Sequence, residues 1–182
     1  PIAAAFAAAE QGKTADDPDP LLTTPARRAQ LAEGLKTRGN AHYSHGDDAA
    51  AVDDYTAGLR ALGDQENKLL RGALLSNRAA VHLRRKEHDL CIKDCNEALK
   101  LDASRAKCYY RRAAAREQQD ALEEAFKDLK ICVQLEPTNK TAVNAARRVK
   151  EKLTQKLKKE KAFATPAERL ALQICQCVET EE

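Results

Sequence analysis

The stretch that decides the fold is Leu75-Ser76-Asn77-Arg78-Ala79-Ala80, because its small residue Ala79 is one of three anchors that recur along the chain. Ala113 follows Ala79 after 34 residues, and Gly39 precedes it by 40, which is one 34-residue period plus six. A repeat of this length indicates a unit of supersecondary structure that is stacked several times. The six extra residues coincide with the polar stretch 63–68, which predicts a longer loop between the first two units.

Small or apolar residues also recur at three positions after each anchor. They fall 12 residues later (Ala51, Cys91, Ala125), 16 later (Tyr55, Cys95, Leu129) and 19 later (Gly58, Ala98, Cys132). Paired helices approach closely where their facing side chains are small, so this spacing predicts helix pairs. We expect the pairs over 27–45 and 48–62, over 67–85 and 88–101, and over 105–118 and 122–135.

A seventh helix is predicted from about residue 139, where apolar residues follow helical spacing (Val143, Ala146, Val149, Leu153, Leu157). It would cover the exposed face of the last unit, as the end of a stacked array requires. We expect the domain over 26–160. Prolines break the helical pattern of 1–25, which we interpret as a linker or appended remnant. Segment 161–182 predicts a short apolar helix and an acidic tail, or the start of a following domain.

The composition narrows the class of protein. The 182 residues carry a formal net charge of +3, with six Cys and no Met. The cysteines lack the spacing of a small secreted framework, so we expect a reducing, cytoplasmic compartment. No run of 18 apolar residues predicts a membrane span. Because Met is absent, we expect a piece of a longer protein.

Polar residues gather where the first helices of the three pairs would line a concave surface. Lys36 and Asn40 lie four residues apart, as do Lys107 and Arg111, and Asn77 stands on the helix between them. No acidic residue recurs at these positions. Hydrogen bonds from charged donors to a carboxylate are about twice as strong as neutral ones. The pattern therefore favours an extended peptide with two nearby carboxylates, which a C-terminal Asp supplies.

The strings LKTRGN (35–40), LSNRAA (75–80) and KCYYRR (107–112) resemble the two-carboxylate-clamp members of the tetratricopeptide-repeat (TPR) family, which includes the Hsp-organising protein. The resemblance covers about residues 30–150. It implies an all-α TPR solenoid of three helix-turn-helix repeats plus a C-terminal capping helix. It further implies a co-chaperone adaptor that binds the Glu-Glu-Val-Asp C-terminus of heat-shock protein 90 or 70.

The family pattern also implies a role for each groove residue. Lys36, Asn40 and Asn77 would hold the terminal carboxylate, Lys107 would hold the Asp side chain, and Arg111 would bond the peptide further along. The pocket for the peptide would be lined by Tyr43, Ala80, Leu83 and Arg84.

A narrower resemblance is to the UCS-domain myosin co-chaperones. It lies in residues 111–118 (RRAAAREQ), 125–128 (AFKD) and 135–140 (LEPTNK), and in the six-residue insertion after the first repeat. In that family the TPR domain recruits heat-shock protein 90, and a separate armadillo-like region binds myosin. The resemblance thus implies a myosin chaperone, whose myosin-binding region lies outside this chain.

Several other interpretations were weighed. His88, Cys91 and Cys95 share a helix face and could bind a metal, but both cysteines fall on predicted core positions, so we predict no metal site. We find no phosphate loop and no paired nucleophile, and predict neither enzyme activity nor a cofactor. Aromatic residues, on which nucleic-acid bases would stack, make up only 4% of the chain, which argues against nucleic-acid binding. The alternatives left open are a structural scaffold whose groove takes another peptide or an internal helix, and the acidic end 178–182 occupying a neighbouring molecule's groove.

Overall fold

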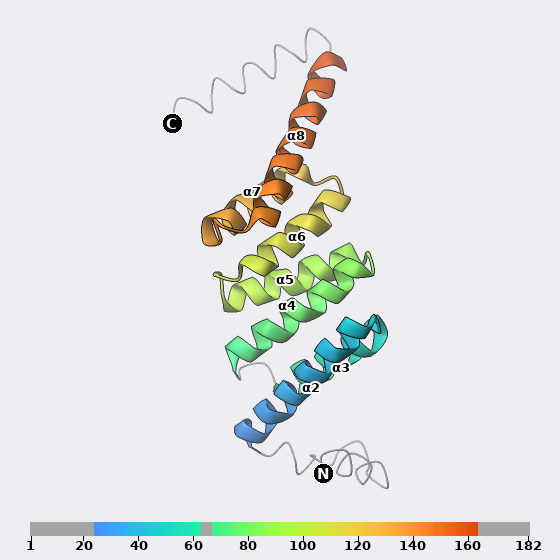
Figure 1. Ribbon diagram of the computed structural model, residues 1–182, viewed down its shortest axis with the longest axis vertical. Coiled ribbons are helices and arrows are strands. Elements are labelled where there is room, and N and C mark those ends of the chain that lie inside the picture. Colours follow the sequence, from blue (N-terminus) through green and yellow to red (C-terminus); the bar gives the residue numbers. More distant parts are fainter. Residues whose placement is uncertain (1–23, 63–66, 164–182) are drawn as a thin grey trace.

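The computed structural model describes residues 24–62 and 67–163, which form seven α-helices stacked in chain order (Figure 1). Their bounds are α2 (Pro25–His45), α3 (Asp48–Leu62), α4 (Lys68–Arg84), α5 (His88–Leu101), α6 (Ala106–Gln118), α7 (Leu122–Leu135) and α8 (Lys140–Phe163). Three helix pairs and one final helix confirm the predicted all-α solenoid. The predicted segment 1–25, apart from its last two residues, lies outside the described residues. So does the predicted segment 161–182, apart from its first three residues, which belong to α8.

Local capping sets the start of the first two pairs. Thr24 accepts the backbone N–H of Arg27, and Pro25 occupies the first helical turn, so α2 begins two residues before the predicted 27. Asn67 has a φ of 42° and accepts the N–H of Leu70. Lys68 therefore belongs to α4 and not to the predicted loop, whose residues 63–66 are outside the described part.

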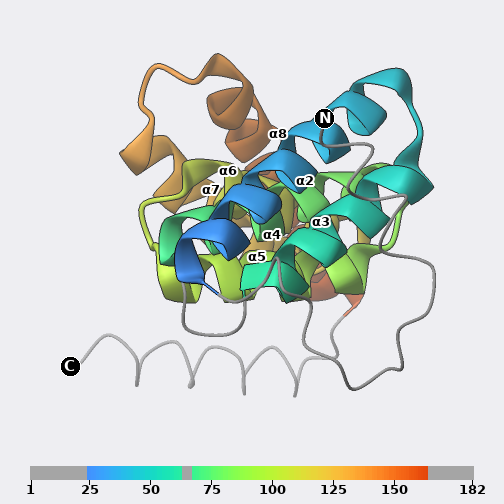
Figure 2. The same cartoon turned by 90° about the horizontal axis from the view of Figure 1, so that it is seen from below.

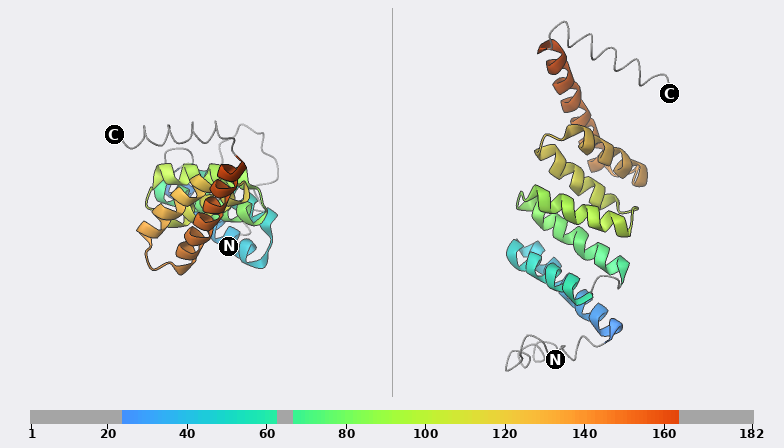
Figure 3. Two further views of the ribbon diagram at one scale, coloured as in Figure 1. Left: turned by 90° about the horizontal axis from the view of Figure 1, so that it is seen from above. Right: turned by 180° about the vertical axis from the view of Figure 1, so that it is seen from behind.

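Each helix contacts its neighbours along one long stack, with α2 at one end and α8 at the other (Figures 1 and 3). The first helices of the pairs also touch one another, α2 with α4 and α4 with α6. A view along the stack shows the successive pairs lying one behind another (Figure 2). This order brings Asn40, Asn77 and Arg111, which are far apart in the sequence, onto adjacent helices.

The repeated small residues are buried at the helix contacts, as predicted. At Gly39 a β-carbon would stand 2.7 Å from the Tyr55 ring, so the absent side chain allows α2 and α3 to approach. At Gly58 it would meet the Leu74 side chain at 3.1 Å. The period of the sequence therefore reflects the packing of helix pairs.

An ion pair with a buried aspartate repeats in every helix pair, and it has a fixed spacing in the sequence. Arg38, Arg78 and Arg112 each precede an anchor by one residue, and each contacts an Asp 16 residues later: Asp54, Asp94 and Asp128. The three aspartates are buried, with side chains at most 8% exposed. The pair ties the first helix of each repeat to the second.

The final helix packs on α7. Ala142, Ala145 and Val149 are buried, whereas Leu157, predicted on the same apolar face, is 44% exposed. The prediction for Leu157 is wrong because α8 extends past the end of α7, so its later turns have no helix to cover. None of the described helices is long and apolar enough to cross a membrane.

Candidate peptide-binding groove

Two of the predicted clamp residues are in direct contact. Asn40 on α2 and Asn77 on α4 face each other, and Nδ2 of Asn77 donates to Oδ1 of Asn40 at 2.9 Å. The hydroxyl of Tyr55, which reaches this point from α3, donates to the same oxygen at 2.8 Å. The contact between α2 and α4 thus brings together residues 37 positions apart.

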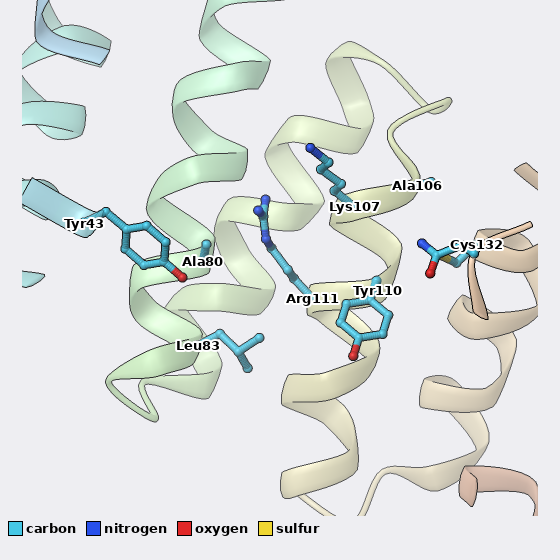
Figure 4. Close-up of a pocket in the computed structure, with 9 residues that line it drawn as sticks. Tyr43, Ala80, Leu83, Ala106, Lys107, Tyr110, Arg111 and Cys132 are labelled. Carbon is cyan, nitrogen blue, oxygen red and sulfur yellow. The ribbon is translucent and has the colours of Figure 1, made fainter. Parts of the chain in front are cut away.

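Lys107 and Arg111 line a hollow of about 320 Å³ (Figure 4). Lys36, Asn40 and Asn77 do not line it, but its wall residues Tyr43 and Ala80 stand one helical turn after Asn40 and Asn77. We call the surface that carries the hollow and the asparagine pair the groove. Arg111 extends from α6 toward α4, and the Tyr43 ring extends toward it from α2. The hollow is lined by Tyr43, Ala80, Leu83, Ala106, Lys107, Tyr110, Arg111, Cys132 and Asn139.

Three of the four predicted pocket residues, Tyr43, Ala80 and Leu83, are among these lining residues. Four further residues line the hollow that were not among the predicted pocket or clamp residues: Ala106, Tyr110, Cys132 and Asn139. Tyr110 lies three residues after Lys107, a spacing that places both on one side of α6 and could have indicated it. The spacing predicts Cys132 as a core residue, and it is buried while also lining the hollow. Asn139 lines the hollow from the turn just before α8.

Arg84, the fourth predicted pocket residue, is not among the residues that line the hollow. Its guanidinium stacks over the Tyr43 ring, 3.8 Å from the centroid, and donates to the backbone carbonyl of Tyr43 at 3.0 Å. It also forms an ion pair with Asp48. Arg84 therefore supports Tyr43, one wall of the hollow, and its charge is already partly neutralised.

Lys36 lies one turn before Asn40 on α2 and forms an ion pair with Glu33. The expectation that the groove cations have no acidic neighbour is therefore wrong at Lys36. Glu33 and Lys36 are three residues apart, and such residues are neighbours on a helix surface. The Lys36 side chain is 22% exposed, so a ligand carboxylate that reaches it would compete with Glu33.

Arg111 is oriented from behind by Ser76. One of its terminal nitrogens, Nη1, donates to the carbonyl oxygen of Ser76 at 2.7 Å and to its Oγ at 2.6 Å. Both acceptors are uncharged, so the positive charge of the guanidinium is not neutralised by them. No carboxylate pairs with Lys107 or Arg111 within the described ranges. These two cations are the strongest feature of the groove for an anionic ligand.

Cys91 and Cys95 are completely buried and belong to the main hydrophobic core. Their burial agrees with the interpretation of these positions as small core residues. Within residues 24–62 and 67–163, no group of three or more His, Cys, Asp or Glu is placed to hold a metal ion.

Comparisons with known proteins show what this chain is similar to. No family model matches the sequence. Protein unc-45 homolog B of Danio rerio is 35% identical over 124 residues, and human RNA polymerase II-associated protein 3 is 38% identical over 128. These matches cover 68% and 70% of this chain but only 13% and 18% of the two relatives.

Solved structures decide the family. The first TPR of Spaghetti (RPAP3), bound to the HSP90 peptide SRMEEVD, is 36% identical with a TM-score of 0.64, and the match covers 69% of this chain and 98% of that one. This chain belongs to the TPR family. It is related to the TPR domains of the unc-45 and RNA polymerase II-associated proteins, as the sequence resemblance implied.

Two further structures of this family are close. The C. elegans myosin chaperone UNC-45, in complex with an Hsp90 peptide, is 34% identical with a TM-score of 0.68 and matches 73% of this chain and 15% of that one. The second TPR of human RPAP3, in complex with the HSP70 peptide SGPTIEEVD, is 34% identical with a TM-score of 0.58. That match covers 70% of this chain and 98% of that one. This TPR domain is thus a co-chaperone-type binding module, and the prediction that it is not an enzyme is confirmed by its relatives.

Proposed function

We propose that the groove binds the C-terminal Glu-Glu-Val-Asp peptide of heat-shock protein 90 or 70 through a two-carboxylate clamp of Lys36, Asn40, Asn77, Lys107 and Arg111. The observation that carries the proposal is the placement of Lys107 and Arg111 in a hollow, with no carboxylate of the described residues paired to them. The wall residues Tyr43 and Ala80 stand one helical turn after the contacting pair Asn40 and Asn77. Related domains, solved with the peptides SRMEEVD and SGPTIEEVD, support it.

The groove offers different chemistry along its length. The asparagine pair and Lys36 provide donors for the terminal carboxylate, and Lys107 provides an ammonium for the Asp side chain. Arg111 bonds the peptide further along. Tyr43, Ala80 and Leu83 form an apolar wall that suits the Val before the terminal Asp and the residues before it. A ligand that contacts all of these residues must be extended and must end in a free carboxylate.

The wider role is part of the proposal. The chain spans 13 to 18% of the length of the first curated relatives that it matches. We infer that the domain is the heat-shock-protein docking module of a cytoplasmic co-chaperone, which in a protein like unc-45 would deliver the chaperone to myosin. A short peptide buries little surface and loses entropy on binding, so affinity on the order of micromolar is expected.

The test is a calorimetric titration with two forms of one peptide that ends in Glu-Glu-Val-Asp. The free acid should bind, whereas the C-terminal amide, which lacks the terminal charge, should bind at least about tenfold more weakly because a charged hydrogen bond is lost. Equal binding of both forms, or binding of neither, would contradict the clamp and favour a scaffold that takes another ligand.

A further inference from the structure

The amide oxygen of Asn40 is fully used inside the protein. A carbonyl oxygen has two lone pairs, and Oδ1 of Asn40 accepts one hydrogen bond from the Tyr55 hydroxyl at 2.8 Å and one from Nδ2 of Asn77 at 2.9 Å. Nδ2 of Asn40 has no acceptor among the described residues, and Asn40 is exposed. The amide therefore presents its two N–H donors to the groove.

Tyr55 helps to hold the Asn40 amide from outside the groove. It comes from α3, the second helix of its pair, and is only 1% exposed. A buried tyrosine hydroxyl needs a hydrogen-bond partner, and Oδ1 of Asn40 is its partner. Burial, the largest cause, raises the pKa of Tyr55 to about 12, so the hydroxyl keeps the proton that it donates.

Gly39 makes the approach of Tyr55 possible. A β-carbon at residue 39 would lie 2.7 Å from one carbon of the Tyr55 ring and 2.9 Å from another, closer than packed carbon atoms come. The ring lies against the backbone of α2 at the residue next to Asn40. The hydroxyl thus reaches Asn40 through a gap that a glycine leaves open.

We propose that Tyr55 is a positioning residue of the carboxylate site, because its hydroxyl anchors the Asn40 amide and, together with Nδ2 of Asn77, holds Oδ1 inside the protein and leaves Nδ2 for the ligand. This inference rests on the proposed function of the groove. If the amide were reversed, Oδ1 would face the ligand carboxylate, and Nδ2 would face the donor of Asn77. Both contacts would be unfavourable, although the Tyr55 hydroxyl could accept from Nδ2 in that case. The network therefore favours a ligand group that only accepts hydrogen bonds, a carboxylate over a carboxamide.

The test compares Tyr55→Phe with a matched control, Tyr109→Phe. Tyr55→Phe keeps the ring that packs against Gly39 and removes only the hydroxyl. Tyr109 lies on α6, is half-buried and does not line the hollow, so Tyr109→Phe makes the same chemical change elsewhere. We expect Tyr55→Phe to weaken binding of a free-acid peptide ending in Glu-Glu-Val-Asp about three- to tenfold, the effect of one neutral hydrogen bond. Tyr109→Phe should leave it unchanged.

Two further readouts separate positioning from loss of structure. The preference for the free acid over the C-terminal amide should fall in Tyr55→Phe and not in Tyr109→Phe. In NMR spectra of the free domain, the side-chain amide signals of Asn40 should shift in Tyr55→Phe and stay in place in the control.

The outcomes distinguish this inference from the proposed function. If the unaltered domain binds the acid and Tyr55→Phe binds it equally well with the same preference over the amide, the positioning role is wrong and the clamp stands. If the unaltered domain binds neither form, the proposed function is wrong. The Asn40 amide signals then decide whether Tyr55 orients that side chain, and unchanged signals would overturn the inference as well.

Discussion

At the scale of single residues, Glu33 is the feature that most changes how the groove would work. It forms an ion pair with Lys36, so the ligand must displace Glu33 to reach that ammonium. Replacing Glu33 with Gln removes the competing charge. We expect the free-acid peptide to bind up to about fivefold more tightly, the effect of one exposed ion pair. Calorimetric titration of Glu33→Gln measures this.

The control for that change is Glu123→Gln, which removes an exposed carboxylate from α7, outside the groove. It alters the net charge equally and should leave the affinity nearly unchanged. An affinity for Glu33→Gln equal to or weaker than that of the unaltered domain would show that Glu33 does not compete with the ligand.

The residues of the groove could be predicted from the sequence where their position depends on helix periodicity. Lys107 and Arg111 are four residues apart, and the 34-residue repeat places them opposite Asn77. Contacts that depend on the offset between helices could not be predicted in this way. Three contacts depend on such offsets: the hydrogen bond from Arg111 to Ser76, the hydrogen bond from Tyr55 to Asn40, and the ion pair that Arg84 forms with Asp48.

At the scale of helices, α8 is held to α6 by a cluster of charges. Glu117 of α6 has a side chain only 5% exposed and accepts hydrogen bonds from Arg148 at 2.7 Å and from Lys152 at 2.7 Å. The hydrogen bond from Arg148, the largest cause, lowers the pKa of Glu117 below its usual value. Asn139, which lines the hollow, lies just before α8, so this cluster also steadies one edge of the groove.

Replacing Glu117 with Gln should therefore destabilise the domain in a pH-dependent way. Because both cations are at least half exposed, we expect a loss of only about 0.5–1 kcal/mol of unfolding free energy at neutral pH. A lowered pKa in the folded state contributes stability above the unfolded pKa, and that stability is lost as the pH falls through the folded pKa. The difference from the unaltered domain should shrink below about pH 4.5.

Urea unfolding at several pH values measures the Glu117→Gln effect, with Glu151→Gln as the control. Glu151 is an exposed residue of α8 for which no ion pair is observed. A loss equal to that of the control, or one that stays constant down to pH 3, would contradict the role of the cluster.

Helix positions were predicted to within one or two residues because small residues and caps recur at fixed spacing. The observed starts of α2 and α4 differ slightly from the predicted ones, because the capping side chains of Thr24 and Asn67 set them. The exposure of Leu157 could not be read from its spacing, because an apolar stripe does not tell where the neighbouring helix ends. The repeated Arg and Asp pairs, by contrast, were visible as a 16-residue spacing in all three repeats.

At the scale of the whole molecule, three stacked helix pairs create a site that no single pair contains. Asn40, Asn77 and Arg111 come from three different repeats, and the proposed ligand must cross all of them. The sequence predicted this arrangement because the stacking order follows the chain order. The same stacking is shared by relatives of different kinds, since the chain is similar to both unc-45 homolog B and RNA polymerase II-associated protein 3.

The most direct test of the central claim is a double-mutant cycle between Lys107 and the last residue of the peptide. Calorimetry would compare the unaltered domain and Lys107→Ala, each with a peptide ending in Glu-Glu-Val-Asp and one ending in Glu-Glu-Val-Asn. Lys93→Ala, at an exposed residue of α5 outside the groove, is the control.

If Lys107 holds the Asp side chain, Lys107→Ala should weaken binding of the Asp peptide about tenfold or more and change binding of the Asn peptide by less than about threefold. Equal weakening of both peptides, or no weakening of either, would contradict a clamp in which separate groups hold the two carboxylates.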